Sequence, residues 1–195
     1  KQNNKVSVDM GRPKFFTDSM ESLFASKPFK GEAVDVGNKH LVIWGNSAEN
    51  SNSDLIDCLN IDSKKLNDLQ SQYNLTFILD DHFNESAYFP QQNEDKLITI
   101  KVREKGAGWT KSCGSGAIAA AALTMDMWYK NGPFQRDDFE DFDSLEKRWD
   151  AGYRALPSPI MIKQEGGVLE VHHDNSGSLK LVGPSEFEYD GVWDG

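Results

Sequence analysis

The feature that most limits how this chain can fold is a short stretch, Ala117–Leu123, that is apolar at every position. The stop signal Asn131-Gly132-Pro133 follows it, so the pattern predicts a helix from about Ser115 to Lys130. A helix that is apolar on every face must be buried on every face. Its alanines let neighbouring strands approach closely, because larger side chains would overfill the space. The sequence therefore predicts a central helix that other elements enclose.

Short alternating or apolar runs supply the enclosing strands, and Gly, Asn, Asp or Pro bounds nearly all of them. The runs are Lys5–Val8, Ala33–Val36, His40–Trp44, Leu75–Leu79, Leu97–Val102, Ile160–Lys163, Val168–Val171 and Leu179–Val182. A second helix is expected near Ser63–Gln72. The economical fold for these elements is α+β, with a curved antiparallel sheet or barrel wrapped around the central helix.

Charge and hydropathy exclude several classes of partner. The chain carries 21 basic and 31 acidic residues, a net charge of −10, which disfavours binding to nucleic acid and to anionic membrane surfaces. No apolar run approaches the roughly 20 residues that span a bilayer. The only cysteines, Cys58 and Cys113, are too few and too far apart to form a disulfide framework. We expect a reducing compartment, the cytoplasm.

The segment Glu104–Ala117 carries the chemistry. A strand ends at Glu104, a glycine-rich turn follows, and Cys113 stands directly before the Gly-Ser-Gly that opens the buried helix. The free N–H groups of a first helical turn form an anion site that suits a substrate carboxylate. The same positive helix end is expected to lower the pKa of the Cys113 thiol and to favour the thiolate.

A thiolate beside an anion site suggests two chemistries. One is nucleophilic attack on a carbonyl carbon or on phosphorus. The other is removal of a proton from the carbon next to a carboxylate. A third interpretation, without chemistry, is that Cys113 is a small buried residue at a tight turn.

The Glu104–Ala117 segment resembles the C-terminal cysteine signature of the diaminopimelate epimerases, Glu-Arg-Gly-x-Gly-x-Thr-x-x-Cys-Gly-Ser/Thr-Gly-Ala. Further resemblances to this family follow in the family's order: Val8–Pro13, Gly37–His40, Tyr73–Phe77, Gly166–Leu169 and Gly183–Ser185. The resemblance implies two pseudo-symmetric domains, each a curved sheet around a helix and each with one catalytic cysteine. One thiolate removes the α-proton and the opposite thiol returns a proton to the other face, so that LL-diaminopimelate becomes the meso form for lysine and peptidoglycan synthesis. Neither pyridoxal phosphate nor a metal is implied.

The resemblance also assigns roles to individual residues. Cys113 is the acid/base of this half, and Gly114 and Ser115 donate backbone N–H groups to the α-carboxylate. Glu104 and His40 assist the thiols and orient the substrate. From the residues alone, Glu104 also fits an exposed charge at a strand end, and His40 fits a hydrogen-bonded strand histidine.

The remaining substrate contacts of the family fall on Asn38, Asn74 and Lys105. The two asparagines would bind the substrate amine or its distal group, although Asn38 also fits an ordinary turn residue. Lys105 stands where the family has an arginine. Arginine is expected to bind a distal carboxylate through two hydrogen bonds, whereas lysine offers only a point charge. Trp109 is also bulkier than the family's usual residue. Cys58 matches no catalytic position and is expected to be structural.

The resemblance divides the chain into three parts. Residues 1–30 lead out of a missing N-terminal domain, residues 31–184 form the C-terminal epimerase-like domain, and residues 185–195 are a closing strand and tail. Polar insertions are expected at residues 82–95 and 134–157. The expected partners are a small amino-acid substrate and the missing N-terminal domain or a complementing half, with a homodimer as a further candidate. The chain alone is expected to be inactive.

Rival interpretations remain. A proline or hydroxyproline racemase and a phenazine-biosynthesis-type isomerase share the implied fold. A non-catalytic binding module that keeps the fold is a rival from another class, and its thiol would be buried and inert. The pair His172-His173 is not expected to bind a metal, because adjacent strand residues point to opposite faces.

Overall fold

The computed structural model describes residues 4–24, 27–45, 63–79, 97–131, 158–174 and 176–185. Within these ranges, ten strands form one sheet and two helices accompany it. The strands are β1 (Asn4–Asp9), β2 (Lys14–Phe24), β3 (Lys27–Asp35), β4 (Lys39–Gly45), β5 (Asn74–Ile78), β6 (Leu97–Glu104), β7 (Gly108–Thr110), β8 (Ile160–Gln164), β9 (Gly167–His173) and β10 (Leu179–Ser185). The helices are α2 (Ser63–Gln70) and α3 (Gly114–Asn131).

The sheet is mixed. Its strand order is β1-β10-β9-β8-β6-β5-β4-β3-β2, and the short β7 pairs with β6 beside this path. The β4–β5 and β6–β8 pairs are parallel, whereas the other pairs are antiparallel. A parallel pair needs a crossover connection, and the two connections contain α2 and α3 respectively. The predicted curved sheet around a buried helix is confirmed, but these two crossovers make it mixed rather than wholly antiparallel.

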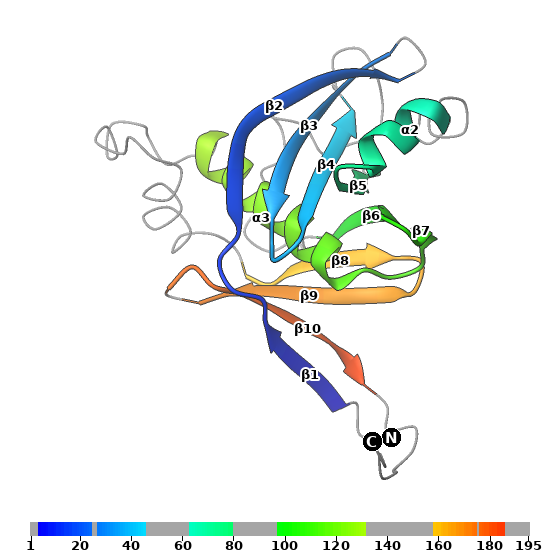
Figure 1. Ribbon diagram of the computed structural model, residues 1–195. Helices are drawn as coiled ribbons and strands as arrows, with labels where there is room; N and C mark the ends of the chain where they lie inside the picture. The colour runs from blue at the N-terminus through cyan, green and yellow to red at the C-terminus, as the bar shows by residue number, and fades with distance from the viewer. Residues whose placement is uncertain are drawn as a thin grey trace, which may run out of the picture.

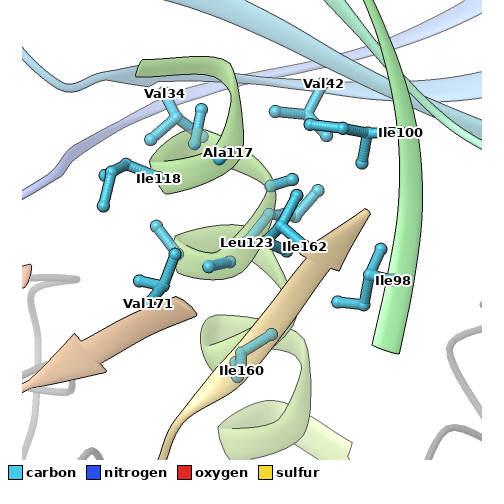
Figure 2. Packing of buried hydrophobic residues seen from close by; sticks show 14 of the residues in the cluster. Val34, Val42, Ile98, Ile100, Ala117, Ile118, Leu123, Ile160, Ile162 and Val171 are labelled. Atoms are coloured by element: carbon cyan, nitrogen blue, oxygen red, sulfur yellow. The ribbon is translucent and has the colours of Figure 1, made fainter. Parts of the chain in front are cut away.

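The central helix is enclosed by strands from both parts of the sheet. Figure 1 shows α3 running between β2–β4 on one side and β8–β9 on the other. Every residue of Ala117–Leu123 has an exposed fraction of 0%. Strand side chains converge on the helix from several directions (Figure 2), and they include Val34, Val42, Ile98, Ile100, Ile160, Ile162 and Val171. The burial that the apolar stretch predicts is therefore confirmed.

The first turn of α3 packs closely against the sheet at Gly116. A Cβ atom built on Gly116 would lie 2.8 Å from Cγ2 of Val102 on β6 and 3.3 Å from Oγ1 of Thr76 on β5. Real Cβ atoms essentially never come within 3.0 Å of such neighbours. The absence of a side chain at Gly116 thus sets how near the helix start lies to β5 and β6.

The other helix, α2, covers the opposite face of the sheet. Its Leu66 and Leu69 are buried in a second cluster with Leu41 and Ile43 of β4. Alternate residues of a strand point to opposite faces, so β4 serves both clusters, with Val42 on the α3 side. His40 lies two residues before Val42, and it therefore faces α3.

All eight predicted strands are present, as are both predicted helices. The strands β2 and β7 were not predicted. The sequence of β2 lacks a clean alternation, and its pairing with β3 shifts register between Phe15 and Ser19. The strand β7 has three residues, too few to show a period.

The described part of residues 1–30 contributes β1, which pairs with β10, and β2, which pairs with β3. The ranges 82–95 and 134–157, as well as Cys58, lie outside the described residues. Among the helices that are described, none is long and apolar enough to cross a membrane.

Candidate active site

Cys113 is the N-cap residue of α3. Its carbonyl oxygen accepts the first helical hydrogen bond from the N–H of Ala117 at 3.0 Å. Its Sγ accepts a hydrogen bond from the N–H of Gly116 at 3.4 Å, as an N-cap side chain does. The side chain is buried, with 6% of the residue exposed. The sequence prediction that this sulfur lies at the start of the alanine-rich helix therefore agrees with the structure.

The first two N–H groups of α3 are available to a ligand. The backbone N–H groups of Gly114 and Ser115 make no hydrogen bond within the described part of the chain. Both residues are half-buried. Because the positive end of the helix dipole lies at the same place, the two amides form the kind of site that binds a carboxylate.

The hydroxyl of Ser115 joins three of the predicted site residues. Its Oγ lies 3.5 Å from Sγ of Cys113 and 3.0 Å from Nε2 of His40. It also accepts a hydrogen bond from Nδ2 of Asn38 at 3.2 Å. Two segments that are far apart in sequence, one with Asn38 and His40 and one with Cys113 and Ser115, thus meet at the start of α3.

His40 is held from both sides of its ring. Nδ1 lies 2.9 Å from Oγ1 of Thr76, opposite the bond to Ser115. Burial lowers the pKa of His40 to about 4, although the charges of Glu104 and Asp35 partly oppose this shift. The imidazole is therefore neutral near pH 7. Being neutral, it exchanges hydrogen bonds with two hydroxyl groups and adds no positive charge beside the thiol.

The pKa of the Cys113 thiol moves in the opposite direction from the sequence expectation. Burial raises it, and the hydrogen bonds from Ser115 and Gly116, which lower it, do not reverse the shift. The carboxylate of Glu104 raises it further, through its charge and its interaction with the thiol. The expectation of a stabilised thiolate is therefore wrong for this chain, because loss of water outweighs the helix end. Because Glu104 influences the pKa of both Cys113 and His40, its carboxylate lies near both side chains.

The other two predicted contacts, Asn74 at the start of β5 and Lys105 in the turn between β6 and β7, contact each other. Asn74 is the neighbour of His40 in the β4–β5 register, and its Oδ1 accepts a hydrogen bond from the backbone N–H of Lys105 at 2.8 Å. Lys105 lines an open cavity of about 480 Å³ with Arg103 and residues of α2, and Cys113 does not line it. Asn74 and Lys105 thus hold the turn, apart from the hydrogen bonds around Ser115.

Three curated proteins show what the chain is similar to. A diaminopimelate epimerase of Xylella fastidiosa is 30% identical over 166 residues, which are 84% of this chain and 43% of that protein. One from Mycobacteroides abscessus is 32% identical over 124 residues, 62% of this chain and 37% of that protein. One from Bacillus licheniformis is 25% identical over 194 residues, 93% of this chain and 54% of that protein. The chain is a relative of the diaminopimelate epimerases.

The chain spans about half the length of the diaminopimelate epimerases that it matches. No family model matches it. The crystal structure of a Bacillus anthracis phenazine biosynthesis protein of the PhzF family aligns with 93% of this chain and 57% of its own, at 12% identity and a TM-score of 0.44.

In this relative of the diaminopimelate epimerases, no group of three or more His, Cys, Asp or Glu side chains could hold a metal ion within the described ranges. His172 instead lies 3.1 Å from Glu170, with its Nε2 next to the carboxylate Oε2. Glu170 also pairs with Lys5 of β1. His172 is therefore part of a contact network between β9 and β1.

Two residues of the site were missed in the sequence analysis, Thr76 and Gln164. The buried side chain of Gln164 contacts the peptide groups of Cys113. A signal for it existed, because Ile160, Ile162 and Gln164 alternate along β8 and a polar residue on a buried face needs a partner. Thr76 had the corresponding signal on β5, where it alternates with the buried Ile78.

Proposed function

We propose that this chain is one acid/base half of an amino-acid epimerase that uses thiols, and not pyridoxal phosphate, to move the α-proton of diaminopimelate. One observation carries the proposal. Sγ of Cys113 lies at the start of α3, beside a hydroxyl that His40 and Asn38 contact and two backbone N–H groups that have no partner among the described residues. The relatives' name supplies the reaction class and the substrate.

The chemistry starts from the carboxylate. Bound at the N–H groups of Gly114 and Ser115, the α-carboxylate of an amino acid would place its Cα near the sulfur. When the α-proton leaves, the electron pair spreads into the carboxylate, where the two amides stabilise the added negative charge. The α-proton is weakly acidic, and each unit of difference between its pKa and that of the thiol costs about 1.4 kcal/mol. Several hydrogen-bond donors must therefore converge on the carboxylate to stabilise the transition state.

Cys113 fits the proton-donating role. Because its pKa is raised, the resting side chain is the thiol. In the donating step the S–H bond breaks, a C–H bond forms on the carbanion, and the sulfur is left as a thiolate. The bonds from Ser115 and Gly116 favour that thiolate and so lower the barrier to its formation.

A second thiol group is needed on the opposite face of the substrate. Inversion at Cα requires removal of a proton from one face and delivery to the other, and Cys113 can reach one face. We therefore propose that another half, with its own cysteine, completes the site. The exposed apolar Val6 and Val8 of β1 are compatible with such a partner, because 50% and 48% of their surfaces are open.

Two measurements on the isolated chain test these proposals. Diaminopimelate should protect Cys113 against alkylation in a Cys58→Ser background, because its carboxylate occupies the helix start. The chain alone should not exchange the α-proton of diaminopimelate for deuterium above the level of a Cys113→Ser variant. Turnover comparable to that of a full-length epimerase would contradict the need for a second half, and absence of protection would contradict the binding site.

A non-catalytic binding module is the second candidate, and one observation favours it. Cys113 is buried and its pKa is raised, as expected for an inert structural thiol. The same alkylation experiment separates the two. An inert Cys113 that diaminopimelate does not affect supports the module, whereas a reactive and protected thiol supports the enzyme.

A further inference from the structure

Gln164 is the last residue of β8, and 6% of its surface is exposed. A buried carboxamide must find partners for its oxygen and for its nitrogen. The partners of Gln164 are the two backbone groups of a single residue. Oε1 accepts from the N–H of Cys113 at 2.7 Å, and Nε2 donates to the carbonyl oxygen of Cys113 at 3.2 Å.

We propose that Gln164 is the positioning residue for the Cys113 thiol. The carboxamide fixes both ends of the Cys113 backbone as a neighbouring strand would. The direction of the Cα–Cβ bond, and hence the place of the sulfur, then depends on Gln164. This inference deepens the proposed function and rests on it for its catalytic meaning, although the geometric part concerns the chain alone.

The turn that follows Gln164 also binds the segment that precedes α3. The N–H of Gly166 donates to the carbonyl oxygen of Lys111 at 2.7 Å. A Cβ built on Gly166 would lie 3.1 Å from that oxygen and 3.1 Å from Cβ of Ser112. Residues 111–113 are therefore held by three hydrogen bonds, two from Gln164 at the end of β8 and one from Gly166 in the turn that follows, before α3 begins.

The side chain at position 164 needs one acceptor and one donor at the same distance from the backbone. A leucine has neither, and an ionised glutamate has two acceptors that would face the carbonyl oxygen of Cys113. A protonated glutamic acid has both, since its hydroxyl donates and its carbonyl accepts. Only glutamine supplies the pair at every pH.

The test is a thiolate titration of Cys113 in a Cys58→Ser background, followed by ultraviolet absorbance and by the rate of alkylation. Gln164→Leu keeps the space filled, so the thiol stays buried while the bonds from Ser115 and Gly116 loosen. The titration midpoint should rise by about half a unit or more, which is roughly a three-fold slower alkylation at a fixed alkaline pH below the midpoint. His40 on β4 and Glu104 on β6, the other titratable groups at the thiol, are unchanged.

Thr124→Val is the matched control. It removes one buried hydrogen bond, from Oγ1 of Thr124 to the carbonyl oxygen of Ala120, in the interior of α3. It should lower the melting temperature without moving the Cys113 midpoint. If Gln164→Leu lowers stability and leaves the midpoint at the wild-type value, Gln164 is a structural residue and the proposal is overturned.

Gln164→Glu, which keeps the shape, covers the case in which the leucine variant does not fold. Its melting temperature should approach that of the wild type at acidic pH, where the acid is protonated, and fall below it as the pH rises and the carboxylate forms. At alkaline pH its Cys113 should be alkylated more slowly than in the wild type at the same pH. A variant equal to wild type at neutral pH would contradict the proposal. None of these measurements uses substrate, so a failed epimerase assay would leave the result for Gln164 intact.

Discussion

Nε2 of His40 lies 3.0 Å from Oγ of Ser115, and the same hydroxyl lies 3.5 Å from Sγ of Cys113. His40 comes from a strand near the beginning of the chain, whereas Ser115 and Cys113 belong to the start of α3. The Ser115 hydroxyl therefore connects His40 to the Cys113 thiol, and the imidazole and the sulfur need no direct contact. The predictions below start from this arrangement.

Ser115→Ala should raise the pKa of Cys113, because it removes a hydrogen bond that favours the thiolate. It also leaves Nε2 of His40 without its partner, so the free energy of unfolding should fall by about 1–3 kcal/mol. Thiol titration and denaturant unfolding measure the two effects. Ser112→Ala, at an exposed serine of the same segment, is the control and should change neither quantity.

Stability should depend on His40 between about pH 4 and pH 6.5. The folded-state pKa, about 4, lies below the ordinary value of 6.5. Between these two pH values His40 is therefore protonated in the unfolded chain and neutral in the folded chain. The stabilisation is complete above pH 6.5 and is lost as the pH falls to about 4, by roughly 3 kcal/mol. Denaturant unfolding across this range should give a much flatter profile for His40→Gln than for the wild type.

Glu104→Gln should lower the pKa of Cys113, because the carboxylate raises it through its charge and its interaction with the thiol. The pKa of His40 should fall too, since the same charge raises it. Alkylation rates as a function of pH report the first change. Glu165→Gln removes an exposed carboxylate whose Oε1 lies 3.9 Å from Nζ of Lys111. An equal shift in that variant would show that overall charge, and not Glu104, is responsible.

Gly116→Ala should destabilise the fold by about 1–3 kcal/mol through overpacking against Val102, although alanine is the better helix former by about 1 kcal/mol. The partner variant Val102→Ala removes the atom in conflict. In the double variant the cost of the added methyl group should largely disappear, and unfolding measurements on all four chains give the coupling. Strictly additive effects would mean that the contact is relieved elsewhere.

The sequence was most informative where a residue pattern has one physical solution. Seven apolar residues without a polar face demand enclosure, and Ala117–Leu123 is enclosed. The cysteine before Gly-Ser-Gly was correctly predicted at the helix start, because glycine and serine there favour an N-terminus. Asn38 and His40 were predicted near it through the family resemblance, and both contact Ser115.

The sequence was least informative where the outcome depends on a balance between residues from distant elements. The direction of the Cys113 pKa depends on burial against two hydrogen bonds and a carboxylate, a balance that local sequence cannot give. The alternation of Gln164 with Ile160 and Ile162 indicates a buried polar side chain, but its partner lies 51 positions away and cannot be identified from that pattern. The parallel pairs follow from crossovers through α2 and α3, which strand periodicity does not reveal.

The strand order also determines when the apolar helix becomes protected during synthesis. The strands β8, β9 and β10, which cover one side of α3, are all made after it, beyond residue 158. A nascent chain that has emerged only as far as residue 131 therefore carries the apolar helix α3, while the strands that cover one of its sides are still untranslated. Translation must therefore proceed through β10 before α3 is covered on that side and hidden from chaperones and from other nascent chains.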